Sequence, residues 1–578
     1  MAAWFSRHVP SWGGPVLLVL AGAIFFWPAI RAGFALDDFV HASMVAGSYP
    51  AHRAPYDLYN LVDDSSRDAL LARGLLPWWT HPHLQISFFR PLASLLRWGD
   101  YLLLGSSALP HHLHSFLWWI AVALTGRAFF RRLLPSRAAA VATVIFALSP
   151  SHSIPLVWLA NREALVSLAF GIPGLLFYVR SREEKSLRFA LAATLLFSAS
   201  LAAGEYGLAF TGYVVAFELF RRGDGLGRRA VGLLPFALPI FLYLGVRTML
   251  GYGAVGSGFY ADPLRDPQAF FEVAPARFAA LLLDAWLALD RETFVASLWQ
   301  TFFVGFAIAS LLLVAVALRP TYRDLVEPTR TRFRWLLLGS TLSLAPMLAV
   351  SPSSRLVGAC LLGIAAIVGL VVERAWFSHE PRSTLRGFAS VAAFLLAFIH
   401  LVHGPASAWL IGRTYRESTD RETQNRESVR ARLDPIAQAD LVVVRGGASA
   451  PFHLPFSIDP AHQLPARFAV LSQTTHVLVL RRDARVIELI AAQNDTLIPL
   501  GEANIYLDMH RVFTVGEVIP FPGGRATIND LAFGRPRIVQ FEFDHDLDTS
   551  PLVWLSETAG GFIDARPPRL GMGTPYDP

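Results

Sequence analysis

The sequence predicts a polytopic α-helical membrane protein of about eleven spans that carries a C-terminal, extracytoplasmic, mainly-β domain. Of its 578 residues, 53% are hydrophobic and 16% are charged, and the mean hydropathy is +0.42. A soluble chain carries about 25% charged residues. Apolar stretches of roughly 17–25 residues, the length of a membrane span, recur over the first 404 positions. After them come short runs rich in Val, Ile and Phe that are separated by Gly, Pro, Asn and Asp, the pattern of strands and turns.

The apolar stretches and their basic flanks predict the membrane topology. The candidate spans are 14–32, 112–130, 138–150, 164–179, 187–203, 207–221, 230–250, 298–318, 335–350, 356–372 and 387–404. If the N-terminus with Arg7 is cytoplasmic, every short Arg-rich loop falls on that side, as the positive-inside rule requires. We therefore expect a multi-pass membrane protein, and the Arg-rich composition suggests that its membrane is a bacterial inner membrane. For the first stretch, a cleaved signal peptide is the alternative.

We divide the chain into a transmembrane domain over 1–404, a charged helical linker over 405–432 and an extracytoplasmic β-rich domain over 433–578. Inside the first domain, 33–111 is a long outer segment with amphipathic helices. Its pair Trp78–Trp79 is typical of an interfacial helix that faces lipid headgroups. We expect an antiparallel arrangement in the β-rich domain, because its strands are short and joined by turns.

Composition and motifs exclude several classes of protein. Cys360 is the single cysteine, so no internal disulfide forms. The net charge of +6 comes from the loop arginines of a membrane protein, so we expect membrane lipids and not nucleic acid as partners. No Walker A, GxSxG, HExxH or CxxC motif is present, so ATP-driven transport, serine hydrolysis and zincin chemistry lack support.

An acidic pair, Asp37–Asp38, directly follows the first apolar stretch on the predicted outer side. Two adjacent carboxylates near a low-dielectric boundary raise each other's pKa. One of them can then act as a general base towards a hydroxyl acceptor, so both are candidate catalytic residues. The alternative is a polar helix end that marks the membrane surface.

Arginines on the same predicted side are candidate ligands of a phosphate group. They are Arg90, Arg162, Arg247 and Arg355. A planar guanidinium can hold phosphate through two hydrogen bonds, and charges near span ends usually face the bundle interior or a cavity. For Arg162 the alternative is a local ion pair with Glu163.

Other polar and aromatic residues on that side are candidates for a substrate pocket. They are His81, His83, His112, His152, Trp158 and Glu205. Histidines also bind metals, and the set His81, His83, His111, His112 and His114 makes a divalent ion an alternative. No ligand motif of fixed spacing is present, so we expect no metal and no certain cofactor. The histidines can also be amphipathic anchors at the interface.

Taken together, these residues resemble the polyprenyl-phosphate-sugar-dependent glycosyltransferases of the GT-C superfamily. The similarity covers 14 to about 404 and rests on the acidic pair, Arg-Pro-Leu at 90–92, the His cluster before the second span, and Phe146-Ala-Leu-Ser-Pro-Ser-His with Trp158 and Arg162. It is closest to the protein O-mannosyltransferase-like branch that includes the TMTC group. This chain has the β-rich domain in place of that group's C-terminal helical repeats. Gly204-Glu205 resembles the family's Lys-Glu, with the Lys replaced by Gly.

The resemblance implies a hexosyltransferase-type enzyme that moves a sugar, with inversion, from a polyprenyl-phosphate donor to an extracytoplasmic hydroxyl. The acceptor is a glycan, lipid or protein, Asp37 is the base, and arginines hold the phosphate. The alternatives are a lipid-linked glycan flippase or other transporter, and a non-catalytic scaffold that presents the β-rich domain. Most ionisable residues stand at span ends, which favours the enzyme over the transporter. The sugar and the oligomeric state are left open.

Overall fold

The computed structural model describes residues 13–221, 223–289, 300–377, 384–433, 435–459 and 461–577. Arg7 and the first residues of the span expected at 298–318 lie outside the described residues. The chain forms two compact units. Unit 1 contains Met1–Gly33, Phe89–Gly251 and Gln268–Glu417, and unit 2 contains Phe34–Phe88, Tyr252–Pro267 and Ser418–Pro578.

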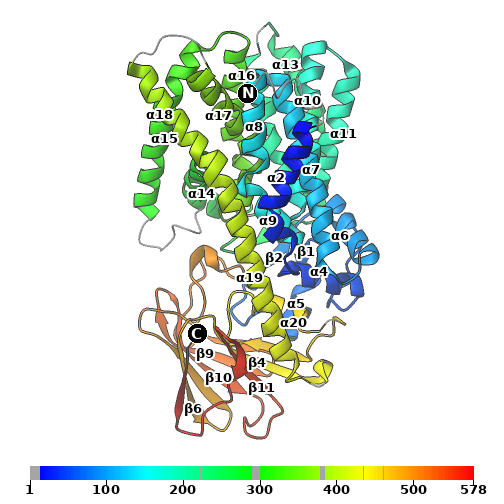
Figure 1. The fold of residues 1–578 in the computed structure, drawn as a ribbon. Helices are drawn as coiled ribbons and strands as arrows, with labels where there is room; N and C mark the ends of the chain where they lie inside the picture. Colours follow the sequence, from blue (N-terminus) through cyan, green and yellow to red (C-terminus); the bar gives the residue numbers. More distant parts are fainter. Residues whose placement is uncertain are drawn as a thin grey trace. The chain divides into compact units, whose positions relative to one another are not determined.

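Unit 1 is helical, and its long helices run alongside one another (Figure 1). Its α-helices are α2 (Gly13–Phe25), α3 (Trp27–Ile30), α6 (Pro91–Leu103), α7 (Ala108–Leu133), α8 (Ser136–Ala147), α9 (Ser153–Val157), α10 (Glu163–Glu184), α11 (Leu187–Ala203), α12 (Phe210–Phe220), α13 (Leu226–Met249), α14 (Pro267–Leu287), α15 (Gln300–Asp324), α16 (Thr329–Leu342), α17 (Gly358–Phe377), α18 (Thr384–Phe398) and α19 (Gly404–Arg430), which continues into unit 2. Short turns join them: the 3₁₀ helices η1 (Pro150–His152), η2 (Leu159–Asn161), η3 (Glu205–Ala209), η6 (Ala345–Ala349) and η7 (Ser354–Val357), and the π-helix η8 (Ile399–His403).

Helix α17 lies in the core of unit 1. Every residue from Gly358 to Val372 is buried, and the stretch is apolar on all sides, as expected of a helix enclosed by others. Two glycines let its neighbours approach closely. A Cβ at Gly363 would lie 2.5 Å from the carbonyl oxygen of Leu336 in α16, and one at Gly369 would lie 2.5 Å from that of Ala138 in α8. Small residues at such contacts are typical of helix packing in membranes.

Six helical segments among the described residues are long and apolar enough to cross a membrane. They are Ala108–Leu133, Leu159–Glu184, Leu226–Met249, Gly305–Asp324, Ser354–Phe377 and Ser390–Arg430. The pair Ser136–Ala147 and Pro150–Val157, bent by 42°, raises the number to seven if it is one span. The unit is therefore that of a multi-pass membrane protein, while the count of eleven and the side on which each loop lies stay predictions.

The difference in number has a physical basis in helix length. Each of the eleven predicted stretches overlaps at least one helix, but several of these helices are shorter than the roughly 20 residues that span a bilayer. Helix α12 has 11 residues and follows the 3₁₀ turn η3, and α16 has 14 residues and ends shortly before η6. The hydropathy of the sequence does not show where a 3₁₀ turn ends an α-helix early.

Unit 2 is a mixed structure built from three separate parts of the chain. Its helices are α4 (Asp37–Ala46), α5 (Arg67–Ala72), α20 (His453–Ser457) and the 3₁₀ turns η9 (Ile436–Gln438) and η10 (Gly501–Ala503). Its strands are β1 (Asn60–Val62), β2 (Gln85–Ser87), β3 (Gly253–Val255), β4 (Asp440–Arg445), β5 (Arg467–Val470), β6 (Val477–Asp483), β7 (Val486–Ala491), β8 (Val518–Phe521), β9 (Gly524–Ala532), β10 (Arg535–Phe543), β11 (Val553–Thr558), β12 (Gly561–Asp564) and β13 (Gly573–Tyr576). The expected boundary at 404 is therefore revised, because most of 33–111 folds with the C-terminal residues.

The strands form three sheets. One has the order β1-β2-β3 and one the order β13-β6-β7-β10-β9-β8, and all their pairs are antiparallel. The third has the order β12-β11-β4-β5, and in it β4 is parallel to both β11 and β5. The expectation of a β-rich C-terminal region is confirmed. The expectation of purely antiparallel strands is wrong for the third sheet.

The tryptophan pair of the segment 33–111 is buried within unit 2. Trp78 and Trp79 are 6% and 1% exposed. The indole Nε1 of Trp78 donates to the carbonyl oxygen of Leu471 at 3.1 Å, and its ring lies edge-on to Phe541. The interpretation of this pair as an interfacial lipid anchor is therefore wrong, because both rings pack within the protein.

Candidate functional site

Two glutamates hold the side chain of Arg90 in unit 1. Arg90 Nη1 donates to Glu163 Oε1 at 3.0 Å, and Arg90 Nε donates to Glu205 Oε2 at 2.7 Å. Arg90 directly precedes α6, Glu163 begins α10 and Glu205 begins η3, so three separate segments meet here. The Glu163 side chain is 1% exposed. A carboxylate this deeply buried requires paired, hydrogen-bonded charges around it.

Arg355 belongs to the same region. Its guanidinium carbon lies 5.2 Å from the ring centroid of Trp158, a cation–π arrangement. Its charge also acts on Glu163 and on the buried Tyr206. Arg355 lies in η7, directly before α17, so the helix that forms the core of unit 1 begins beside these charges.

Arg247, in the last turn of α13, completes the group. The Tyr243 hydroxyl, one turn earlier, donates to the carbonyl oxygen of Phe89 at 3.1 Å. Arg90, Arg247 and Glu205 all lie within electrostatic range of that hydroxyl. We refer to Arg90, Glu163, Glu205, Arg247 and Arg355 as the arginine–glutamate cluster.

Several polar atoms of this region are buried and have no hydrogen-bond partner among the described residues. They are Glu163 Oε2, Glu205 Oε1 and Trp158 Nε1. An unpaired buried polar atom costs about 1–3 kcal/mol, and each such case in a native structure calls for a partner that the chain does not supply. Gly204 borders the same place: a Cβ there would lie 3.3 Å from Glu163 Cγ and 3.7 Å from Arg90 Cδ. A side chain at 204 would therefore crowd the cluster.

The structure thus brings together several residues that the sequence singled out on separate loops, namely Arg90, Trp158, Glu205, Arg247 and Arg355. They stand at the ends of α6, α9, α11, α13 and α17, where the predicted topology places one side of the membrane. Ionisable groups gathered among membrane helices usually serve binding or catalysis.

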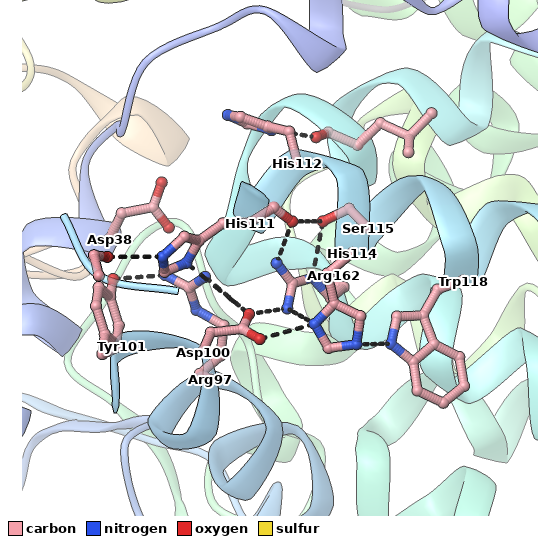
Figure 2. A network of polar contacts seen from close by, with 12 residues as sticks. Asp38, Arg97, Asp100, Tyr101, His111, His112, His114, Ser115, Trp118 and Arg162 are labelled. Carbon is pink, nitrogen blue, oxygen red and sulfur yellow. Dashed lines mark hydrogen bonds and ion pairs between the residues drawn. The ribbon is translucent and has the colours of Figure 1, made fainter. Parts of the chain in front are cut away.

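Arg162 lies in a different set of contacts (Figure 2). It is 1% exposed, its Nε donates to Ser115 Oγ at 2.7 Å, and its Nη2 donates to the carbonyl oxygen of His111 at 2.7 Å. Its Nη1 pairs with Asp100. The guanidinium is thus held by groups of the protein. The local pair with Glu163 does not form, since Glu163 pairs with Arg90.

Asp100 is the centre of that network, and Figure 2 shows its carboxylate between Arg162 and His114. Trp118 Nε1 donates to His114 Nε2 at 3.0 Å, so the proton of the neutral ring is on Nδ1, which donates to Asp100 at 2.7 Å. Burial alone would raise the pKa of Asp100. The hydrogen bond from His114 and the charge of Arg162 outweigh it and hold that pKa at about 2. Asp100, in the amphipathic helix α6, is a fixed negative charge that the sequence analysis missed.

Two of the predicted pocket histidines are core residues. His112 Nδ1 lies 2.9 Å from the carbonyl oxygen of Leu156, and its Nε2 lies 3.4 Å from that of Gly33. His152 Nε2 lies 3.0 Å from the carbonyl oxygen of Phe146. Both side chains are at most 1% exposed. They satisfy backbone carbonyl groups at helix ends, so the pocket assignment is corrected for both.

His81 and His83 belong to unit 2. His81 Nε2 lies 3.4 Å from Asp508 Oδ2, and its backbone N–H donates to the carbonyl oxygen of Tyr506 at 2.8 Å. Burial lowers the pKa of His81, and His83 is exposed. Across the described ranges, no three His, Cys, Asp or Glu side chains are grouped so as to hold a metal ion.

The acidic pair begins α4 in unit 2, and its two members differ. Asp38 is 1% exposed, and its Oδ2 accepts the backbone N–H of Ala35 at 3.0 Å, so it fixes the turn before the helix. Asp37 Oδ1 lies 2.9 Å from Nε2 of His453. The sequence analysis missed His453, because a contact between residues 416 positions apart leaves no local signal.

Comparison with known proteins gives distant likenesses only. No family model matches the chain, and no curated protein does. One similar solved structure is ArnT from Cupriavidus metallidurans bound to undecaprenyl phosphate, with 14% identity, a TM-score of 0.44, and coverage of 79% of this chain and 86% of that chain. Another is the oligosaccharyltransferase AglB from Archaeoglobus fulgidus in complex with an inhibitory peptide and a dolichol-phosphate, with 13% identity, a TM-score of 0.43, and coverage of 80% and 65%. Likeness at this level assigns the chain to no family.

Proposed function

We propose that the chain is a membrane glycosyltransferase of GT-C type that takes a sugar from a polyprenyl-phosphate donor. The observation that supports this is the arginine–glutamate cluster of unit 1. It combines guanidinium groups with buried carboxylate oxygens that lack protein partners, within a helical unit that carries candidate membrane spans.

The donor has the chemistry that this cluster lacks. Its phosphate accepts the hydrogen bonds that guanidinium groups donate. Its sugar hydroxyls donate to acceptors such as Glu163 Oε2 and Glu205 Oε1. Three guanidinium groups and two carboxylates carry a net charge of +1, which the single negative charge of a phosphodiester balances. Its polyprenyl chain is apolar, and so is the surface that membrane helices present to lipid, so the two surfaces are compatible.

The reaction needs a base for the acceptor and stabilisation of the leaving group. The acceptor hydroxyl attacks the anomeric carbon from the face opposite the phosphate, so the configuration inverts. Asp37 supplies the carboxylate of the group that takes the hydroxyl proton, and negative charge builds on the departing phosphate. One preorganised donor to such a charge is typically worth about 3–4 kcal/mol. Arg90 is held rigid by two carboxylates and Arg355 lies against Trp158, which suits both to this role.

The finer features are proposed on the motif resemblance. The donated sugar is a hexose, the acceptor is an extracytoplasmic glycan, lipid or protein hydroxyl, and no metal takes part. The chain works in a bacterial inner membrane with unit 2 on the outer side. Arg162 and Asp100 act by fixing the N-terminal end of α10, from which Glu163 projects.

The test uses the purified full chain in vesicles with radiolabelled polyprenyl-phosphate hexoses, together with glycan analysis of the cell envelope with and without the gene. The Asp37→Asn variant should abolish transfer while it binds donor and folds normally. Asp64→Asn is the matched control, because Asp64 is an exposed acid of the same segment. Near-normal transfer by Asp37→Asn would remove Asp37 from the mechanism. Movement of intact lipid-linked glycan across the bilayer without transfer would favour a transporter.

A further inference from the structure

A hollow of about 370 Å³ lies beside α4 in unit 2, and Asp37 is not among the described residues that line it. His453, the partner of Asp37, does line it. The remaining lining is apolar, acidic and, at Arg426, basic, and it includes Phe39, Glu422, Glu557 and Phe562. The imidazole of His453 thus connects the predicted catalytic carboxylate to the hollow.

His453 is held in place by its surroundings. It begins the short helix α20, after Phe452 at a φ of +67°. The helix contacts α4, and its Phe456 stacks on Tyr49, which follows α4, with ring centroids 5.5 Å apart. The imidazole Nε2 lies 2.9 Å from Asp37 Oδ1. A non-glycine residue with this backbone conformation is uncommon and is often found at functional sites.

The protonation state follows from these contacts. Because a carboxylate only accepts hydrogen bonds, Nε2 of His453 carries the proton that Asp37 accepts, and Nδ1 of the neutral ring is an acceptor. His453 Nδ1 is buried and has no hydrogen-bond partner in the parts of the chain that the structure describes. A histidine oriented by a carboxylate through one nitrogen, with the other nitrogen available, is the arrangement of a general base.

Charged side chains surround His453. Asp37 lies on one side, and the half-buried Glu422 of α19 interacts electrostatically with His453. Arg426 lies over the ring of Phe39, 4.3 Å from its centroid, and also acts on Glu422. The Glu557 carboxylate accepts hydrogen bonds from the backbone N–H of Gly447 and from Asn425. An imidazolium formed here is therefore flanked by carboxylates.

We propose that His453 is the base that deprotonates the acceptor, that Asp37 orients it, and that this hollow binds the acceptor; the inference rests on the proposed glycosyl transfer. The acceptor O–H proton passes to His453 Nδ1 while Nε2–H stays bonded to Asp37. The acceptor oxygen forms the bond to the anomeric carbon, and the bond from that carbon to the phosphate oxygen breaks, with its electron pair left on the phosphate. His453 then releases its proton to water.

The lining also indicates the class of acceptor. The carboxylates of Glu422 and Glu557 outnumber the one guanidinium of the lining, that of Arg426, and accept hydrogen bonds from hydroxyl groups, while aromatic rings offer apolar surface. An uncharged carbohydrate presents hydroxyl groups at its rim and C–H groups on its faces, so it matches both kinds of lining. The acceptor is accordingly a neutral sugar or polyol.

The test compares His453→Gln, His453→Ala and wild type in the vesicle assay. The amide of Gln can still donate to Asp37 from the position of Nε2 but offers no base at Nδ1. In both variants we expect kcat to fall by at least about 10²-fold, the usual contribution of a general base, with the KM for the donor unchanged. Added imidazole should restore transfer by His453→Ala. His476→Gln is the matched control, because His476 makes an exposed pair with Asp577 at 2.9 Å and is not among the residues that line the hollow. It should transfer at the wild-type rate.

Glu422→Gln gives an independent measurement if the His453 variants fail to fold. It should raise the KM for a neutral sugar acceptor several-fold and leave the KM for the donor unchanged. Suppose that the wild type transfers sugar. Equal transfer by His453→Gln, or an unchanged acceptor KM in Glu422→Gln, would then overturn this inference and leave the proposed function intact. If the wild type transfers no sugar from any polyprenyl-phosphate donor, the proposed function itself is wrong.

Discussion

Replacing Arg90 by methionine tests the arginine–glutamate cluster most directly. Methionine keeps much of the apolar stem and removes the two hydrogen bonds, at 3.0 Å to Glu163 and at 2.7 Å to Glu205. Since the Glu163 side chain is 1% exposed, its charge would lose this partner where water cannot replace it. Removing one partner of a buried ion pair costs about 3–5 kcal/mol. We therefore expect Arg90→Met to lower the free energy of unfolding by about that amount and to abolish transfer.

Arg90→Lys separates charge from geometry. A lysine ammonium keeps the charge but cannot reproduce the rigid fork that joins two carboxylates. Loss of one charge-assisted hydrogen bond, worth about 1.5–3 kcal/mol, corresponds to a roughly ten- to hundredfold slower transfer. The measurements are the denaturation midpoint in detergent and the initial rate of sugar transfer in vesicles.

The control for both variants is Arg413, which pairs with Glu417 on α19 where both side chains are more than half exposed. Such a surface pair is worth about 0–1 kcal/mol, so Arg413→Met and Arg413→Lys should behave like wild type. The reasoning about a buried cluster fails if Arg90→Met denatures at the same midpoint as Arg413→Met, or if Arg90→Lys transfers sugar as fast as wild type.

Three other predictions concern separate parts of the molecule. The pKa of Asp100 is depressed to about 2 in the folded chain, so its contribution of about 2 kcal/mol is present above about pH 5 and lost as the pH falls towards 2; acid denaturation should show a smaller pH dependence in Asp100→Asn than in wild type. Trp78→Phe removes the hydrogen bond to Leu471 and should lower stability by about 1–3 kcal/mol, whereas an unchanged melting temperature would indicate that the indole does not hold unit 2 together. Trp158→Leu removes the ring beneath Arg355 and should raise the donor KM by up to roughly tenfold; an unchanged donor KM would argue against a phosphate role for Arg355.

The sequence predicts the helical membrane part well because its signal is local. Apolar stretches such as 356–372 correspond to helices such as α17, since burial on all sides requires apolar residues on all sides. Arg247 and Arg355 stood out for a similar reason, because charged residues beside membrane spans usually face the bundle interior or a cavity. What local patterns could not predict is where 3₁₀ turns shorten helices such as α12.

Contacts between distant segments account for most of the remaining differences. The place of Trp78 depended on Leu471, and the partner of Asp37 depended on a turn before α20. Arg162 was misjudged because its acidic partner, Asp100, lies in another helix, while the adjacent Glu163 turns to Arg90. Residue type and spacing indicate that a side chain has a role, but only the fold determines which residue it contacts.

The division of unit 2 among three stretches of the chain has a consequence for biosynthesis. The backbone N–H of Phe468 donates to the carbonyl oxygen of Arg73 at 2.9 Å, and the carbonyl oxygen of Phe468 lies where a Cβ on Gly74 would be. These partners leave the ribosome nearly 400 residues apart, so the early stretch lacks these contacts while most of the helices are inserted. A ribosome that stops before residue 418 would release a chain whose first loop lacks its C-terminal partners. Quality-control proteases should therefore remove truncated copies even when every span has been inserted.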